Sequence, residues 1–399
     1  MTADAVPPLD AEYVLPLRWT DDQGLDDLTR YLHRLARIVP VTVVDGSPGP
    51  VFAEHHRRWS ATVRHIVPEA GLGAGLGLGR NGKVAGVLTG VQQARSDRVV
   101  VADDDVRYDT AALVRLVGLL DVADVVRPQN HYDPLPWQAR WDTGRTLVNR
   151  GLGADFPGTL GVRRSTLLRA GGYDGDVLFE NLELIRTVRA AGGTELRADD
   201  LYVARRPPSV RHFWSQRVRQ AYDSQAQPLR LAAELALLPV VACAGRRRTS
   251  IVLGLLTGAV LVAERGRRRA GGGAVFPAGS ALFAPLWVAE RAVCSWVAVL
   301  LRLRGGVPYA GARLRRAATP QRQLRARYAA VQGRREGGDG VPGPEHGEAG
   351  HGPSDRGTTV HGSREGDAAA RGPLASRPEH VASAPSVTPS LRPAAGRAS

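Results

Sequence analysis

The sequence predicts an α/β protein with three parts: a domain with a Rossmann-like, mixed but mostly parallel sheet over residues 1–225, a membrane-associated helical region over 226–320, and a disordered tail over 321–399. Up to about residue 206, β-branched runs alternate with segments whose apolar residues recur at helical spacing, as in sheets covered by helices. Long apolar runs bracketed by arginines come next. The last part is mainly Gly, Pro, Ser, Ala and charged residues, which bury too little apolar surface to offset the entropy of ordering.

Each element of the predicted sheet domain has its own signal. EYVLPLRW (12–19) is predicted to be the first strand, and LDDLTRYLHRLARI (25–38) a helix, because its apolar residues recur every three or four positions. PVTVVDGS (40–47) is a β-branched run that ends in turn residues, which favours a strand. NGKVAGVLTGVQQA (81–94) is predicted to be helical, and DRVVVADDD (97–105) to be a buried strand.

Carboxylates mark the ends of two of these strands. Ligands of open α/β sheets bind beyond the carboxyl ends of strands, so a site is expected at Asp45 and at Asp103–Asp105. Residues two apart in an extended backbone point to the same side, and the carboxylates of Asp103 and Asp105 therefore suit a hard cation such as Mg²⁺ or Mn²⁺. The alternative is a solvated acidic turn that caps a helix beginning at Thr110.

The segment between these strands is rich in glycine and precedes the only lysine of the chain, Lys83. Gly77, Gly79 and Gly82 fit the Gly-x-Gly-x-x-Gly formula of dinucleotide-binding loops. A good first strand does not precede them, and no Gly-Lys-Ser/Thr follows. We therefore interpret the segment as a loop beside a donor site, with a plain linker as the alternative.

The positive charge of the chain lies mainly in its second part. The formal net charge is +14, but residues 1–225 hold 28 basic and 28 acidic groups, whereas residues 226–320 hold 14 arginines and only three glutamates. Arginines that bracket apolar runs suit an anionic lipid surface better than a DNA groove, so a membrane is the expected partner and nucleic acid is not.

Three apolar runs occupy this second part, at 228–245, 249–263 and 275–301. A spanning helix needs about 20 apolar residues; only the third run is that long, and Glu290 and Arg291 interrupt it. The first run suits either a span or the membrane interface, and a soluble helical subdomain is the alternative. The N-terminal stretch has no apolar core of a secretory signal, so the sheet domain is expected on the cytoplasmic side of the plasma membrane.

Seven segments stand in the order that one enzyme family shows. They are VLPLRWTDDQGLDDLTRYL, VTVVDGS, RNGKVAGVLTGVQQA, VVVADDDV, FPGTLGVRRSTLLRAGGYD, FENLELIRTVRAAGG and HFWSQRVRQAYD. Over residues 12–225 the chain thus resembles the family-2 glycosyltransferases, which have the GT-A fold. APLWVAERAVCSWVAVLLRLRGGVPYAGARL looks like the tail of membrane-bound members, including the ceramide-glucosyltransferase-like branch.

This resemblance implies a donor site. Asp45 would lie beside the nucleotide base, and Asn81 and Lys83 would line the donor pocket. Asp103 and Asp105 would form the family's Asp-x-Asp, which holds the metal and contacts the sugar nucleotide.

The resemblance also implies residues for the diphosphate and the acceptor. Gln216 and Arg219 match the family's Gln-x-x-Arg-Trp, but Gln220 replaces the tryptophan, and Trp214 is the aromatic residue nearby. His212 is a candidate further ligand for metal or phosphate, with a packing role as the alternative.

The expected general base departs from the family pattern. The family has Glu-Asp where this chain has Glu180 and Asn181, and an amide does not accept a proton at neutral pH. Glu180 and Glu183 lie three apart on a helix predicted to run to about Ala191. We favour Glu180 as the base, with Glu183 next and a helix-dipole role as the alternative for both.

The prediction is a metal-dependent, inverting glycosyltransferase that uses Mg²⁺ or Mn²⁺. It would move a sugar from a nucleotide-diphospho-sugar to a hydroxyl of a lipid or lipid-linked glycan at the membrane. One alternative is a nucleotidyltransferase on a related sheet, which requires a basic glycine-rich segment after the first strand where this chain has acids. Another is a non-catalytic membrane scaffold, in which Asn181 and Gln220 mark lost activity.

Overall fold

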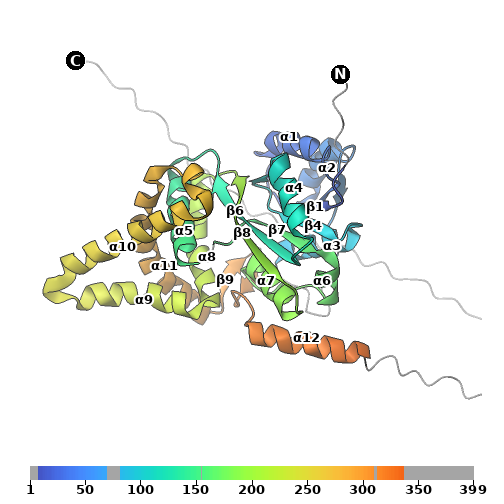
Figure 1. Cartoon of the computed structure of the whole chain (residues 1–399). Helices are drawn as coiled ribbons and strands as arrows, with labels where there is room; N and C mark the ends of the chain where they lie inside the picture. The colour runs from blue at the N-terminus through green and yellow to red at the C-terminus, as the bar shows by residue number, and fades with distance from the viewer. Residues whose placement is uncertain (1–7, 70–80, 154, 310–311, 337–399) are drawn as a thin grey trace, which may run out of the picture. The chain divides into compact units, whose positions relative to one another are not determined.

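The computed structural model describes residues 8–69, 81–153, 155–309 and 312–336 (Figure 1). Eight strands form one sheet in the order β3-β2-β1-β4-β7-β6-β8-β5. Their bounds are β1 Glu12–Leu17, β2 Val41–Asp45, β3 Arg64–Ile66, β4 Arg98–Ala102, β5 Val106–Arg107, β6 Val125–Tyr132, β7 Thr159–Arg163 and β8 Glu195–Arg205.

The sheet is mixed. β1 pairs in parallel with β2 and β4, β2 pairs in parallel with β3, and β6 pairs in parallel with β8. β7 runs antiparallel to β4 and β6, and the short β5 runs antiparallel to the end of β8. The predicted α/β class with a mostly parallel sheet is confirmed.

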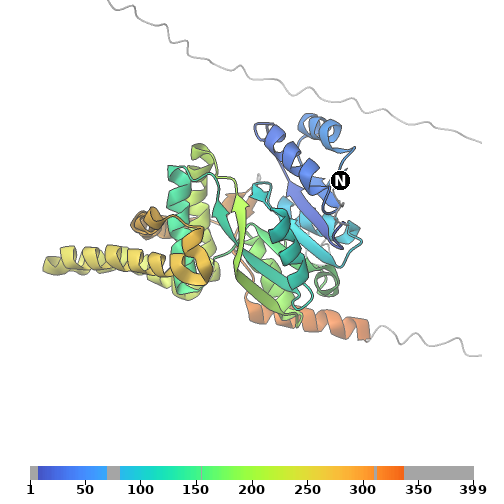
Figure 2. The same cartoon turned by 45° about the horizontal axis from the view of Figure 1, so that its top comes forward.

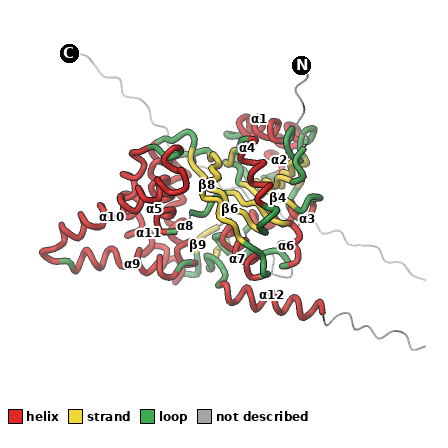
Figure 3. Tube along the Cα trace, in the orientation of Figure 1, coloured by secondary structure: helices red, strands yellow, loops and turns green. Residues whose placement is uncertain are grey.

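Helices cover both faces of the sheet, as Figure 3 shows. Alternate residues of β1 explain how: Tyr13 and Leu15 are buried with the apolar stripes of α1 (Leu25–Leu35) and α4 (Thr110–Leu119), whereas Val14 is buried with α3 (Gly82–Gln93) and α7 (Glu180–Ala190) on the other face. The sheet is thus the middle layer of three. α2 (Gly49–Trp59) packs beside α1, and the short α6 (Arg164–Arg169) lies near α3 and α7.

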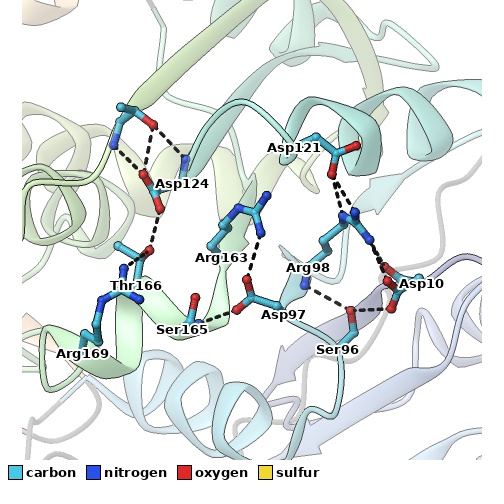
Figure 4. A network of polar contacts seen from close by, with 11 residues as sticks. Asp10, Ser96, Asp97, Arg98, Asp121, Asp124, Arg163, Ser165, Thr166 and Arg169 are labelled. Carbon is cyan, nitrogen blue, oxygen red and sulfur yellow. Dashed lines mark hydrogen bonds and ion pairs between the residues drawn. The ribbon is translucent and has the colours of Figure 1, made fainter.

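The amino end of β4 is closed by a polar network (Figure 4). Asp97 accepts hydrogen bonds from the backbone N–H of Ser165 at 2.7 Å and from Arg163 at 3.0 Å. Arg98 pairs with Asp10 and Asp121, each at 2.7 Å. This network satisfies the charges at one end of β4, and the three aspartates lie at the other end.

The predicted helical region packs directly on the sheet domain. α10 (Arg248–Arg268) lies along α5 (Trp137–Leu152), and α11 (Ala284–Leu303) packs on α5, on α8 (Val210–Asp223) and on α9 (Pro228–Cys243). Glycines permit the closest approach, because a Cβ on Gly266 of α10 would overlap the carbonyl oxygen of Leu147 in α5. The sheet and these helices therefore pack as one compact unit.

Two helical stretches of the described chain, Gly245–Ala274 and Ala278–Leu303, are long and apolar enough to cross a membrane. Figure 1 shows α9 and α10 as two arms that meet at a tip away from the sheet, and Figure 2 shows the same tip projecting from the domain. Apolar side chains are exposed along all three helices: Leu229, Leu238 and Val240 on α9, Leu253, Leu256 and Leu261 on α10, and Leu286, Val293, Trp296, Val297, Leu300 and Leu303 on α11.

Three local predictions differ from the structure. The strand predicted over 97–105 ends at Ala102, so the aspartates lie in the turn beyond it. α4 is capped by Asp109, whose side chain accepts from the backbone N–H of Ala112, and the acidic turn is not its cap. The predicted tail begins with α12 (Gln321–Glu336), which packs against α7; its remaining residues, 337–399, lie outside the described residues.

Candidate active site

A cavity of about 670 Å³ opens beyond the carboxyl ends of the strands, where open α/β sheets bind their ligands. Its wall includes the ends of several strands and the residues just after them: Leu17, Gly46, Asp103, Asp104, Asp105, Tyr132 and Arg205. Helices α3, α5, α7, α8, α9 and α11 and the segments between them supply much of the rest. The helical region is therefore part of the cavity wall, which the sequence did not indicate.

Lys83 links two predicted site residues, Asp103 after β4 and Glu180 at the start of α7. It lies in the first turn of α3, and its Nζ is 2.5 Å from Asp103 Oδ1 and 2.5 Å from Glu180 Oε1. The three side chains are only 21%, 18% and 12% exposed, so this is a largely desolvated cation between two carboxylates. Burial alone would lower the pKa of Lys83, but the charges of Asp103 and Glu180 raise it well above its usual value. Lys83 is thus a fixed positive charge in the cavity wall.

Arg205, at the end of β8, holds the other side of the aspartate pair. Its Nε donates to Asp105 Oδ2 at 2.7 Å, and its Nη2 lies 3.3 Å from Asp103 Oδ2. Gly158 makes room for this contact, because a Cβ there would lie 2.6 Å from Asp103 Oδ2. Burial raises the pKa of Asp105 to about 6, since the opposing charge of Arg205 only partly compensates.

The donor set at Asp103 and Asp105 fits a hard divalent cation. Asp105 Oδ1 is buried and has no hydrogen-bond partner among the described residues, although buried carboxylate oxygens are normally bonded. Both carboxylates line the cavity, and Mg²⁺ and Mn²⁺ favour oxygen ligands of this kind. These two residues can therefore hold the predicted metal, with Asp105 Oδ1 as the available ligand atom. Asp104 between them accepts a hydrogen bond from the Trp19 indole.

Asp45 is placed differently. It ends β2 as predicted, but it is buried, and its carboxylate bonds to His55 Nδ1 at 2.6 Å, to His65 Nε2 at 3.1 Å and to the backbone N–H of Ser47 at 2.8 Å. Burial alone would raise its pKa, yet these hydrogen bonds hold the pKa of Asp45 well below its usual value. The next residue, Gly46, reaches the cavity wall, whereas Asp45 does not.

The Asp45, His55 and His65 ligand atoms all lie within 4.8 Å of one another. Atoms that share a tetrahedral metal at 2.0–2.1 Å are about 3.3 Å apart. The 2.6 Å contact between Asp45 and His55 is instead a hydrogen-bond length. We therefore interpret this group as a buried hydrogen-bonded cluster that positions the end of β2.

Asn81 also has a positioning role. It caps α3, its Oδ1 accepts from the backbone N–H of Lys83 at 3.1 Å and from the hydroxyl of Tyr309 at 3.0 Å, and its Nδ2 donates to the Val177 carbonyl at 3.1 Å. It is buried behind the cavity wall. Asn81 thus fixes the turn that presents Lys83. The glycine-rich residues 70–80 before it, including Gly77 and Gly79, lie outside the described residues.

Helix α8 brings the predicted Gln216, Arg219 and His212 to the cavity wall. The Arg219 guanidinium lies 4.7 Å from the ring centre of Tyr309, in β9 (Val307–Tyr309), which pairs with β10 (Ala312–Leu314). Burial, together with the charge of Arg219, lowers the pKa of His212. The aromatic ring beside Arg219 therefore comes from Tyr309. Trp214 is 53% exposed and is outside the cavity wall.

The two candidate bases have different surroundings. Glu180 lines the cavity with one oxygen bound to Lys83, and Asn181 beside it donates to the Pro157 carbonyl at 2.9 Å. Glu183 is buried outside the cavity wall and accepts from the backbone N–H of Thr319 at 2.6 Å. Burial raises the pKa of Glu183. Of the two, only Glu180 faces the cavity.

Several cavity residues escaped the sequence reasoning: Arg205, Tyr309, Asp223, Arg230 and Arg291. They come from β8, β9, the end of α8, α9 and α11. Arg205 stands at the end of β8, and a charged residue at a strand end is a signal present in the sequence. Arg230 and Arg291 reach the cavity because α9 and α11, which the sequence indicated as membrane segments, pack against the sheet domain.

No protein-family model matches this sequence, and no curated protein matches it. The chain is similar in structure to a mannosyltransferase from Pyrobaculum calidifontis in complex with GDP-Man and Mn²⁺, with 15% identity and a TM-score of 0.44, over 73% of this chain and 88% of that one. It is also similar to mannosyl-3-phosphoglycerate synthase from Rubrobacter xylanophilus, with 20% identity and a TM-score of 0.32, over 51% and 69%. A third is glucosyl-3-phosphoglycerate synthase from Mycobacterium tuberculosis in complex with Mn²⁺, UDP and phosphoglyceric acid, with 17% identity and a TM-score of 0.34, over 51% and 73%. We transfer no activity and no residue from these structures to this chain.

Proposed function

We propose that the chain is a GT-A glycosyltransferase that transfers a sugar from a nucleotide-diphospho-sugar to a hydroxyl acceptor with inversion. One observation carries this proposal: Asp103 and Asp105, Lys83 and Glu180 meet on one wall of a single cavity at the carboxyl ends of the strands. The family-2 resemblance assigned Asp103, Asp105 and Lys83 from separate motifs, and Glu180 is the base that the sequence favoured. The folded chain has Lys83 in contact with both Asp103 and Glu180.

The charges of this wall suit a donor diphosphate. Asp103 and Asp105 would hold Mg²⁺ or Mn²⁺, and this cation, when bound, neutralises negative charge on the diphosphate. Lys83 adds a positive charge that is fixed in place before the donor arrives, and Arg219 adds a second from α8. Preorganised charges of this kind stabilise the charge that develops on the leaving group more than mobile ones do.

Leu17, Gly46 and Pro68 form the end of the cavity nearest β2, and there we place the nucleoside. Asp45 contributes indirectly by fixing the turn at Ser47 through the hydrogen bond of 2.8 Å. The acceptor would then enter from the side formed by α8, α9 and α11, so that the sugar lies between Asp103 and the helices.

We further propose that the outer faces of α9, α10 and α11 lie in the lipid interface at the cytoplasmic side of the plasma membrane. The charged residues that interrupt the third apolar run face inward: Glu290 accepts from the Trp141 indole at 3.0 Å, and Arg291 donates to Gln220 at 3.3 Å. α11 therefore has one face packed on the domain and one exposed apolar face, an arrangement that favours a helix lying on the membrane over one crossing it.

Donor binding tests the enzymatic proposal. Purified protein in detergent is titrated by calorimetry with a panel of UDP- and GDP-sugars, with Mn²⁺ and then with EDTA in its place. We expect one donor to bind in the presence of Mn²⁺ and binding to weaken when the metal is removed. A protein that binds no member of the panel, with or without metal, would not be a glycosyltransferase of this class.

Flotation with anionic liposomes tests the membrane proposal. Leu300→Glu, on the exposed face of α11, should reduce the bound fraction. The matched control is Val122→Glu, which places the same charge at an exposed apolar position of the sheet domain. Equal flotation of both variants would contradict the assignment of this face.

A further inference from the structure

The cavity has a second end, formed by residues that the donor site does not use. Asp223 closes α8, Ser224 and Gln227 follow it, and Arg230 and Arg291 reach in from α9 and α11. We call these five residues the helical end of the cavity.

Two charged groups at the helical end have buried atoms without a hydrogen-bond partner among the described residues. Within the described part of the chain, Asp223 Oδ1 is buried with no hydrogen-bond partner, and the same holds for Nε and Nη1 of Arg291, which is 1% exposed. The remaining nitrogen, Nη2, lies 3.3 Å from Gln220 Oε1 and 3.2 Å from Glu290 Oε1. Buried polar groups are nearly always hydrogen-bonded. Unpartnered atoms of an acid and of a base in one cavity therefore point to a ligand that carries both a hydrogen-bond donor for Asp223 and an acceptor for Arg291.

The other charged groups of this region already have partners. Arg230 pairs with Glu234 at 3.0 Å, and Arg217 pairs with Asp142 at 2.8 Å. Arg219 stacks on Tyr309. Arg291 has two unpartnered guanidinium nitrogens within the described part of the chain, Nε and Nη1. Together they can bind a carboxylate or phosphate through paired hydrogen bonds.

We propose that the helical end is the acceptor subsite: Asp223 accepts the proton of the acceptor hydroxyl, and Arg291 binds an anionic group of the same molecule. The acceptor is then a hydroxyl-bearing anion, a phosphorylated or carboxylated alcohol. This proposal rests on the glycosyltransferase function above and names the acceptor class and the base for it.

The step balances. The acceptor O–H bond breaks and its proton passes to Asp223, while the acceptor oxygen forms a bond to the anomeric carbon. The bond from that carbon to the diphosphate breaks on the opposite face, and the electron pair leaves with the nucleoside diphosphate. The proton on Asp223 is then lost to water, which restores the carboxylate.

Asp223 suits this role better than either glutamate. One oxygen of Glu180 is bound to Lys83, and Glu183 is bonded to Thr319 outside the cavity wall. Burial raises the pKa of Asp223 to about 7, with Arg219 of α8 opposing the shift, Glu180 of α7 adding to it, and Arg291 of α11 and Arg230 of α9 opposing it. A base with a pKa near the working pH is the most effective.

The test uses the full-length protein in detergent, loaded with Mn²⁺ and with the nucleoside diphosphate of the donor that binds in the panel above. Glycerol 3-phosphate is the soluble anionic probe, and glycerol is its neutral counterpart. Vesicles of phosphatidylglycerol present the same phosphate and hydroxyl chemistry on a lipid, and vesicles of phosphatidylcholine lack the free hydroxyl. Calorimetry measures binding, and sugar transfer to each probe is measured with the intact donor.

We expect glycerol 3-phosphate to bind and glycerol not to bind. Arg291→Met should weaken that binding by about tenfold to hundredfold, because the charged hydrogen bonds to the phosphate are lost. Arg291→Lys should weaken it by less, because lysine keeps the positive charge. Arg304→Met, an exposed charge deletion just after α11, is the matched control and should leave binding unchanged. Asp223→Asn should keep probe binding within about threefold and lower transfer by about 10²–10⁴-fold.

Transfer to glycerol 3-phosphate or to phosphatidylglycerol supports the proposal and shows whether the acceptor is free or in a lipid. The proposal is wrong if glycerol binds as well as its phosphate, if Arg291→Met binds like the wild type, or if donor and probe bind together without transfer. It is also wrong if Glu180→Gln stops transfer while Asp223→Asn does not. Each of these results is obtained with protein that has already bound a donor in the panel, whereas a failure of the glycosyltransferase proposal is seen earlier, as the absence of any donor binding.

Discussion

Removal of the Lys83 charge is the perturbation for which the structure makes the sharpest prediction. Lys83→Met keeps the length and the apolar stem of the side chain but deletes the cation between Asp103 and Glu180. Two carboxylates, 18% and 12% exposed, would then face each other without the charge that now separates them. The variant should be less stable than the wild type and should show a stronger response to divalent cations.

The size of the effect follows from the burial of the pair. Removal of one partner from a buried ion pair costs about 3–5 kcal/mol, and the partial exposure here suggests the lower limit, about 3 kcal/mol. In domains of roughly 150–250 residues, 1 kcal/mol changes the Tm by about 2–4 °C, so a loss of about 3 kcal/mol should lower the Tm by about 6–12 °C. Mn²⁺ should restore part of this loss, because a cation at Asp103 replaces the missing positive charge and no longer competes with Lys83 for Oδ1.

Thermal unfolding with increasing Mn²⁺ measures both effects. The matched control is Arg115→Met, which breaks a surface pair with Asp200 at 2.6 Å; its partners are 47% and 55% exposed, and such pairs contribute about 0–1 kcal/mol. If Lys83→Met unfolds like this control and gains no more from Mn²⁺ than the wild type does, Lys83 is not the charge that holds the aspartate pair. Lys83→Arg keeps the charge but replaces a compact ammonium by a planar fork, and it should weaken donor binding.

Three further predictions follow from single features of the structure. Asp105→Ala should abolish metal-dependent donor binding in the calorimetric panel, because it removes the unpartnered Oδ1, and retained binding would exclude this residue as a ligand. Gly266→Ala should lower stability by about 1–3 kcal/mol in denaturant unfolding because its methyl group overlaps the backbone of α5, whereas Gly254→Ala, with open space around it on the same helix, should be neutral or raise stability by up to about 1 kcal/mol; equal effects would contradict the packing. The transfer rate should rise with pH through about 7, because the pKa of Asp223 is raised to that value and only the ionised form accepts a proton; Asp223→Asn should remove this step from the pH profile.

Local patterns in the sequence were sufficient to predict several strands and helices of the sheet domain. β1, β2, α1 and α3 have bounds close to those predicted, because alternation and helical spacing are properties of consecutive residues. The positions of Asp103 and Asp105 at the end of a strand followed from the same patterns.

The contacts of the site needed the tertiary structure. Lys83 and Glu180 are 97 residues apart, and Arg205 is 100 residues from Asp105. A sequence pattern shows that a charged residue stands near a strand end, but it does not show which opposite charge meets it there. The role of Asp45 illustrates this limit, because the two histidines that take its carboxylate come from α2 and β3.

The sequence alone determined the α/β class, the carboxylates at the strand ends and the arginine-bracketed apolar runs, all of which depend on neighbouring residues. Only the tertiary structure decided what the apolar runs do. α11 carries Glu290 and Arg291 among apolar residues, which reads as an interrupted span, yet the fold turns these two charges inward against α5 and α8 and places Arg291 in the cavity wall. A charged side chain can be buried only where a partner from elsewhere in the chain meets it, and the position of that partner depends on the tertiary structure.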